Sequence, residues 1–187
     1  FIPEEALPLL KIIIDALSPH VDFWLAETTS SIGEAEAVIE ALAGDNRPLW
    51  ISFTLLDAIE VSDTTPRLRS NQEVASAATF AAESGASAIL FNCSQPEVMT
   101  PAIDTAMQVV KRLATNLRIG VYANAFPPFQ DDALANSTLH EIRRDLDPSG
   151  YLDFVNTWCR LGATIIGGCC GIGPEHIAAI RKNLKTA

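Results

Sequence analysis

The sequence contains neither a long hydrophobic run nor an excess of positive charge. No apolar run approaches the roughly 20 residues that a helix needs to span a membrane, so we expect no membrane segment. The 13 lysines and arginines are outnumbered by 23 aspartates and glutamates, which gives a formal net charge of −10. Because surfaces that bind nucleic acid are usually basic, this balance argues against a nucleic-acid partner.

Cysteine is also scarce, and no two cysteines have Cys-x-x-Cys spacing. Four cysteines in 187 residues do not suggest a disulfide scaffold, and the missing Cys-x-x-Cys pair weighs against a thiol redox protein. A reducing, cytoplasmic setting is the simpler expectation. No signal peptide is recognisable, although the chain begins at Phe1 rather than Met. With 48% hydrophobic residues, the composition suits one soluble domain with a core.

Apolar segments of strand character alternate with segments of helical periodicity along the whole chain. The predicted strands are residues 21–26, with residues 27–29 as the carboxyl end of that strand, and residues 48–54, 88–92, 118–124 and 164–166. The predicted helices are residues 1–17, 31–43, 71–84, 96–115, 151–161 and 174–185, the fourth starting at Pro96 or Pro101. This alternation predicts an α/β fold with a parallel sheet and helices outside it. Five strands are too few to close an eight-stranded barrel.

Two segments carry narrower expectations. Residues 12–14 are a short isoleucine run between Lys11 and Asp15, which we interpret as the core-facing side of the first helix. Residues 125–148 form a longer, acidic connection that contains prolines. We expect its middle either to order only in part or to cover the site.

The most informative stretch is residues 163–177. It reads as a buried strand, a glycine-rich turn with two adjacent cysteines, and a helix that opens near Pro174, where proline fits the first turn. The glycines allow a sharp turn and leave room for a ligand. Cys169 and Cys170 are poorly placed to bond to each other, but a bent turn can aim both sulfurs at one metal. Catalytic zinc takes three protein ligands and keeps one position open.

Cys93 is the best candidate for the third ligand. It follows the apolar segment 88–92, so Cys93 and Cys169 both come at the carboxyl end of a strand. In a parallel barrel those ends open on the face where active sites are built. The alternative is that all three are buried, inert cysteines. Cys159, beside Trp158 in a predicted helix, is expected to pack in the core.

Together these residues resemble the homocysteine S-methyltransferase family, from about Val21 to Leu184. The matching motifs are Glu27-Thr28, Asn92-Cys93, Trp158, Gly167-Gly168-Cys169-Cys170, Pro174 and His176-Ile177. The resemblance implies a parallel (β/α)8 TIM barrel, of which this chain carries about the fourth to the eighth strands. Residues 1–187 would then be a single partial barrel domain for zinc and homocysteine, without the first three strands. Such a piece has two open sheet edges and is expected to need the missing half or a second copy.

The resemblance also implies a function: transfer of a methyl group to the thiol of homocysteine, giving methionine. The donor would be S-methylmethionine, S-adenosylmethionine or a similar compound. Zn²⁺ would be bound by Cys93, Cys169 and Cys170, with the substrate thiol in the open position. No catalytic residue is expected beyond this metal-activated thiol. The partners are therefore small molecules. The alternatives are an inactive zinc-binding barrel remnant, or transfer to another thiol or selenol such as selenocysteine.

Three further residues are assigned to the substrate through this resemblance. Glu27 would bind the α-ammonium group, although a helix N-terminal acid acting on the helix dipole is the alternative. Asn92 would hydrogen-bond the substrate or orient the Cys93 turn. Asn124 matches the family's Tyr-Pro-Asn, here Tyr-Ala-Asn. His176 is expected to be structural rather than a zinc ligand. The family usually has glycine two positions before its Asn-Cys, where this chain has Leu90.

Overall fold

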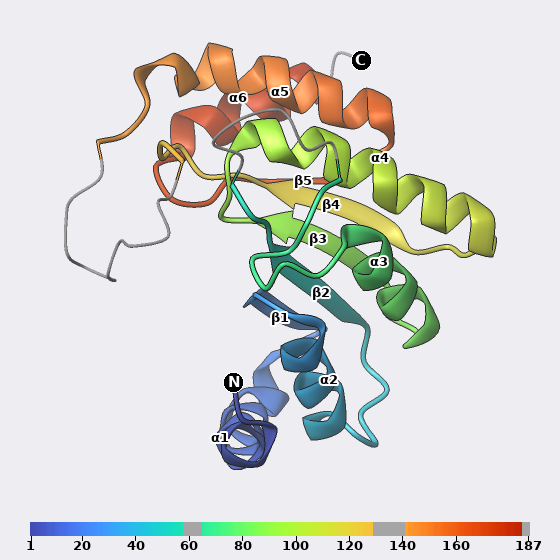
Figure 1. The fold of residues 1–187 in the computed structure, drawn as a ribbon. Helices are drawn as coiled ribbons and strands as arrows, with labels where there is room; N and C mark the ends of the chain where they lie inside the picture. The colour runs from blue at the N-terminus through green and yellow to red at the C-terminus, as the bar shows by residue number, and fades with distance from the viewer. Residues whose placement is uncertain (58–64, 129–140, 185–187) are drawn as a thin grey trace.

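Five parallel strands lie side by side in chain order, with helices between them (Figure 1). The structure is a computed structural model and describes residues 1–57, 65–128 and 141–184. The strands are β1 (Trp24–Thr29), β2 (Leu49–Thr54), β3 (Ala88–Asn92), β4 (Arg118–Tyr122) and β5 (Ile165–Ile166). The helices are α1 (Pro3–Leu17), α2 (Ile32–Ala41), α3 (Val74–Glu83), α4 (Pro96–Leu113), α5 (Pro148–Leu161) and α6 (Pro174–Leu184). This is the predicted α/β architecture, a run of strand–helix units of the TIM-barrel kind.

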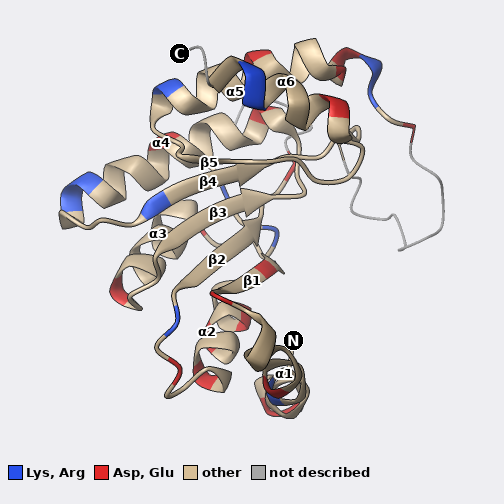
Figure 2. Ribbon diagram, turned by 180° about the vertical axis from the view of Figure 1, so that it is seen from behind, with Lys and Arg blue, Asp and Glu red and all other residues tan. Residues whose placement is uncertain are grey.

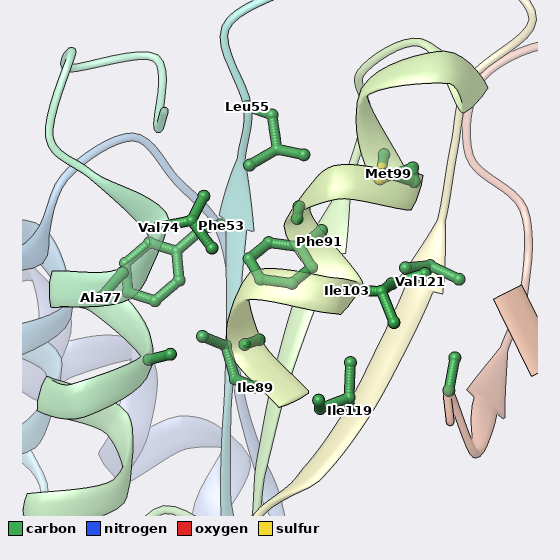
Figure 3. Close-up of a cluster of buried hydrophobic side chains, with 14 of the residues drawn as sticks. Phe53, Leu55, Val74, Ala77, Ile89, Phe91, Met99, Ile103, Ile119 and Val121 are labelled. Carbon is green, nitrogen blue, oxygen red and sulfur yellow. The ribbon is translucent and has the colours of Figure 1, made fainter. Parts of the chain in front are cut away.

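The main core lies between the sheet and the helices that cover it. Alternate residues of β2, β3 and β4 face this side, and Phe53, Phe91 and Val121 are fully buried there. Figure 3 shows them against Val74 of α3 and Met99 of α4. Within the described residues, no helix is long and apolar enough to be a candidate membrane span.

The opposite, inner face of the sheet becomes polar toward the carboxyl ends of the strands. Asn92 pairs in register with Thr54 on one side and Tyr122 on the other. Among the strand residues that the structure describes, Glu27 and Arg118 are the charged ones. Figure 2 shows that most other charges lie on helices and loops. A polar strand end on a largely uncharged sheet marks the face on which a site can be built.

The first helix does not have the core-facing side that its isoleucine run predicted. None of its residues is buried, and Ile12 and Ile13 keep 66% and 53% of their surface exposed. The helix packs beside α2 at the β1 end of the sheet (Figure 1). The prediction of a core-facing side was therefore wrong, because no described element covers Ile12 and Ile13.

Several predicted boundaries were wrong for local reasons. The first strand ends at Thr29 as predicted but starts at Trp24 rather than at residue 21, because its pairing with β2 begins at Trp24 opposite Leu49. The third helix starts at Val74 rather than 71, because Asn71 has a left-handed backbone with φ +69°. The fourth helix begins at Pro96, and its other candidate start lies inside it. The middle of the 125–148 connection and residue 185 lie outside the described residues.

Candidate metal centre

The structure brings the three predicted cysteines together. Their Sγ atoms all lie within 4.8 Å of one another. Cys170 Sγ is 3.9 Å from Cys93 Sγ and 3.8 Å from Cys169 Sγ. All three are free thiols, since a disulfide would require sulfurs about 2 Å apart. Two segments separated by more than seventy residues thus converge at the carboxyl ends of β3 and β5.

The chain that follows β4 holds these two segments in place. On one side, the Cys93 amide donates to the Tyr122 carbonyl at 3.2 Å. On the other side, the Cys169 amide donates to the Ala123 carbonyl at 2.9 Å, and the Ala125 amide donates to the Cys170 carbonyl at 2.8 Å. These bonds continue the sheet pairing beyond the strands. The extension of β4 therefore sets the spacing between the two cysteine segments.

A buried tyrosine, which the sequence analysis missed, ties the same segments together. Tyr151 of α5 is fully buried, and its hydroxyl donates to the Gly167 carbonyl at 2.9 Å. The same oxygen accepts from the Ala123 amide at 3.1 Å. One hydroxyl thus links the β4 extension to the glycine-rich turn. No signal in the sequence indicated this role, because a tyrosine on the apolar face of a helix is usually an ordinary core residue.

The glycine-rich turn needs its glycines for space and for backbone conformation. A Cβ atom on Gly168 would collide with the side chain of Ile172. Gly171 has φ +81°, a region that favours glycine, and a Cβ there would lie 2.9 Å from that of Ala125. The turn is therefore tight enough to present two adjacent cysteines on one side.

Because the three thiols lie close together, their pKa values shift in different directions. A hydrogen bond from Cys169 lowers the pKa of Cys93 to about 6 against the effect of burial, with smaller contributions from Cys170, the Asn124 amide and the positive charge of Arg69. The hydrogen bond with Cys93, together with burial, raises the pKa of Cys169. Burial is the largest cause that raises the pKa of Cys170. Without a compensating cation, such a cluster releases one proton easily and holds the others.

The donor set and spacing fit a zinc ion. Zinc bonds thiolate sulfur at about 2.3 Å in tetrahedral geometry, which places two ligand sulfurs about 3.8 Å apart. The Cys169–Cys170 and Cys93–Cys170 Sγ separations, 3.8 and 3.9 Å, agree with that edge length. Cys93, Cys169 and Cys170 would be the ligands, and three protein ligands leave one tetrahedral position for another group.

The three residues assigned to the substrate lie around this cluster in different ways. Asn124 is nearly buried beside Cys93, and its Oδ1 accepts from the Phe126 amide at 3.2 Å. Glu27 is exposed on β1. Burial is the largest cause that raises the pKa of Tyr122, and a hydrogen bond to Ser52 opposes it. The nearby Glu27 carboxylate raises this pKa further.

Asn92 has no exposed surface, and both ends of its amide are used. Its Oδ1 accepts from Ser52 Oγ at 2.8 Å, and its Nδ2 donates to Thr28 Oγ1 at 2.7 Å. Of the two roles considered for Asn92, this arrangement suits an orienting residue better than a direct substrate contact.

His176 and Cys159 take the structural roles that the sequence predicted. His176 is buried, with Nδ1 accepting from the Gly173 amide at 3.1 Å and Nε2 lying 2.9 Å from the Leu146 carbonyl. Both ring nitrogens are therefore engaged away from the cysteines. Trp158 is fully buried in the core, and Cys159 packs against the same core from α5.

Comparison with known proteins gives a consistent result. Residues 7–184 match the family model described as homocysteine S-methyltransferase. The chain is 32% identical over 175 residues to the homocysteine S-methyltransferase of Escherichia coli K12, covering 93% of this chain and 50% of that protein. It is 26% identical over 176 residues to the selenocysteine methyltransferase of Astragalus bisulcatus, covering 89% of this chain and 45% of that protein.

A solved structure resembles the fold as well. The crystal structure of the homocysteine methyltransferase MmuM from Escherichia coli, in its oxidized form, superposes with a TM-score of 0.66 at 22% identity. The match covers 95% of this chain and 52% of that one, so the chain spans about half the length of the relatives that it matches. Because the family model covers nearly all of the chain, this protein belongs to the homocysteine S-methyltransferase family.

Proposed function

We propose that this chain carries the zinc and thiol site of a methyltransferase that converts homocysteine to methionine. The observation that carries the proposal is the convergence of three cysteine sulfurs within 4.8 Å at the carboxyl ends of two strands. Family membership supports the reaction class. Unpaired cysteines suit a reducing compartment, so we propose that the protein acts in the cytoplasm.

Each residue of the site has a defined task in this proposal. Cys93, Cys169 and Cys170 hold the zinc, which when bound lowers the pKa of an incoming thiol so that its sulfur reacts as a thiolate. Glu27 binds the α-ammonium group of the acceptor through its exposed carboxylate. Asn124, beside Cys93, directs its amide toward the sulfur cluster and helps to hold the acceptor there.

The proposed step is a displacement at the methyl carbon. The acceptor thiol gives its proton to solvent, and its sulfur forms a bond to the methyl carbon. The bond from that carbon to the donor's leaving group breaks at the same time and takes its electron pair with it. A positively charged sulfonium donor, such as S-methylmethionine or S-adenosylmethionine, leaves as a neutral thioether and thus suits this reaction.

We also propose that residues 1–187 belong to one barrel domain. The edge strand β1 needs a cover, because unpaired strand edges expose backbone donors and acceptors. Further barrel strands or a second copy of the chain would supply it. The substrates remain small molecules, homocysteine and the methyl donor.

Metal analysis of the purified protein tests the ligand set. Wild-type protein should carry one zinc per chain, and Cys93→Ser should lose most of it, because serine is a poor zinc ligand. Cys159→Ser is the matched control: Cys159 lies in α5 outside the cluster, so this variant should keep its zinc. Equal zinc content in the Cys93 and Cys159 variants would contradict the proposed ligands.

The reaction itself is tested by methyl transfer from each sulfonium donor to homocysteine. Wild type and Cys159→Ser should form methionine, and Cys93→Ser should lose activity together with its zinc. Selenocysteine as an alternative acceptor separates the two acceptor classes, because a relative of this chain is named for it.

A zinc-binding protein without transferase activity is the second candidate. The specific observation in its favour is the open inner face at β1, where Leu25 keeps 38% of its surface exposed. Stoichiometric zinc without methyl transfer from any donor would support this candidate and exclude the transferase.

A further inference from the structure

Thr28 occupies a backbone conformation that its side chain disfavours. Its φ is +59°, in the left-handed region, although threonine is β-branched. Such a residue persists only where its surroundings hold it. It lies within the register shift between β1 and β2, between Ala26 and Thr29. Irregularities of this kind re-aim side chains next to active sites, and here the neighbouring side chain is Glu27.

A hydrogen-bonded chain of hydroxyl and amide groups, buried in its middle, holds this turn. Tyr122 donates through its hydroxyl to Ser52 Oγ at 2.7 Å, and Ser52 donates to Asn92 Oδ1 at 2.8 Å. Asn92 then donates through Nδ2 to Thr28 Oγ1 at 2.7 Å. Ser52 and Asn92 have no exposed surface. Buried groups that are fully bonded in this way are rigid, and losing one partner leaves the next unsatisfied.

The same asparagine also adjoins the metal centre. Its next residue is Cys93, which has φ +50° and so, like Thr28, a left-handed backbone. The Cys93 amide is fixed by the Tyr122 carbonyl at 3.2 Å. Asn92 therefore belongs to the cysteine turn through its backbone and to the Thr28 turn through its side chain.

We propose that Asn92 and Thr28 are positioning residues that fix the Glu27 carboxylate relative to the cysteine cluster. The inference rests on the proposed function, in which Glu27 binds the acceptor's ammonium group while the acceptor's sulfur lies at the cysteines. The bond from Asn92 to Thr28 then sets the distance between the two ends of the acceptor. It makes the site selective for thiols that carry an α-amino group, without any direct contact between Asn92 and the acceptor.

Thr28→Val tests this positioning role, because valine keeps the branched shape and removes the oxygen that Asn92 bonds. Two probe thiols are compared on the zinc-loaded full chain by calorimetry: homocysteine, and 4-sulfanylbutanoic acid, which differs by lacking the amine. Wild type should bind homocysteine more tightly. In Thr28→Val the dissociation constant for homocysteine should rise about tenfold, while that for the amine-free thiol and the zinc content stay unchanged.

Thr28→Ser is the matched control and should keep the wild-type preference, because it retains the hydroxyl. Asn92→Leu should reproduce the loss seen in Thr28→Val where it folds. If Thr28→Val keeps the wild-type preference, or weakens both thiols equally, the positioning role is overturned while Glu27 keeps its assignment. If wild type binds both thiols equally, the Glu27 assignment itself is overturned, and this inference falls with it.

Discussion

Strands β3 and β1 contribute to the same site but differ in how the protein holds them. All five residues of β3 are buried, and regular pairing with β2 and β4 fixes it on both sides. Within the part of the chain that the structure describes, strand β1 pairs only with β2, shifts register before its end and leaves Leu25, Glu27 and Thr28 exposed. The cysteine half of the site therefore rests on the core, whereas the Glu27 half lies at an edge.

This difference separates what the two halves are suited to do. A metal centre needs ligands held at fixed spacing, and the central strands provide it through backbone bonds on both sides of the β4 extension. A residue that binds the substrate can lie on an edge strand, provided that a contact fixes its position when the substrate binds. The hydrogen bond from Asn92 to Thr28 is suited to this fixing role, since it joins the buried strand β3 to the exposed strand β1.

The largest expected difference between the two halves is the loss of stability when a large apolar side chain is truncated to alanine. Phe91 on β3 is fully buried among β2, α3 and α4 (Figure 3), so Phe91→Ala should lower the free energy of unfolding by about 3–5 kcal/mol. Leu25→Ala on β1 is the control and should cost far less, because Leu25 is 38% exposed. Urea denaturation of both variants measures this. Comparable losses would mean that the β1 edge is covered in solution.

A second test concerns the packing directly under the site, where Leu90 meets Gly120. A Cβ added to Gly120 would lie 2.8 Å from Leu90 Cδ2 and 2.9 Å from Ile165 Cβ. Gly120→Ala should therefore destabilise the protein by about 1–3 kcal/mol through overpacking. The same substitution at Gly33 of α2, where only Ser31 Oγ lies within 4 Å of the added atom, should be neutral or stabilising.

Combining the change at Gly120 with Leu90→Ala sharpens this test. The smaller side chain at position 90 gives the added methyl group room, so the double variant should lose less stability than the sum of the two single variants. Additive losses would show that Leu90 and Gly120 do not constrain each other. Leu90 stands where the family usually has glycine, and this pairing with Gly120 explains how the larger residue is accommodated.

A third, smaller effect is expected at Tyr151, which joins the two cysteine segments. Tyr151→Phe leaves the Ala123 amide without its buried partner and should cost about 1–2 kcal/mol. Because the hydroxyl also fixes Gly167, zinc affinity should fall about tenfold, as for other outer partners of metal ligands. Competition with a chelator of known affinity measures the change. Unaltered zinc affinity would confine Tyr151 to a structural role.

The sequence predicted the rigid half of the site better than the exposed half. Residues 88–92 were predicted as a strand with the boundaries that the structure has. A short apolar run between two turns in an α/β sequence is typical of a buried strand. The convergence of Cys93 with Cys169 and Cys170 followed from their places at strand ends, where parallel strands open on one face.

What the sequence could not predict depends on pairing between strands. The register shift between Ala26 and Thr29 of β1 is a property of its contact with β2, and no periodicity within residues 21–29 reveals it. The hydrogen-bonded chain from Tyr122 to Thr28 likewise needs the register of four strands before its members become neighbours.

The smallest expected effect is on α1, and it tests how exposed this end of the molecule is. Ile12 is 66% exposed, so Ile12→Ala should change the free energy of unfolding by no more than about 0.5 kcal/mol, as is usual for surface substitutions. Ile103→Ala, on the fully buried face of α4, is the matched control and should cost about 2–5 kcal/mol. A loss above 1 kcal/mol for Ile12→Ala would mean that another surface covers this face in solution. The β1 end of the molecule would then be better supported than its exposed surface indicates, and the contrast between the two halves of the site would be weaker.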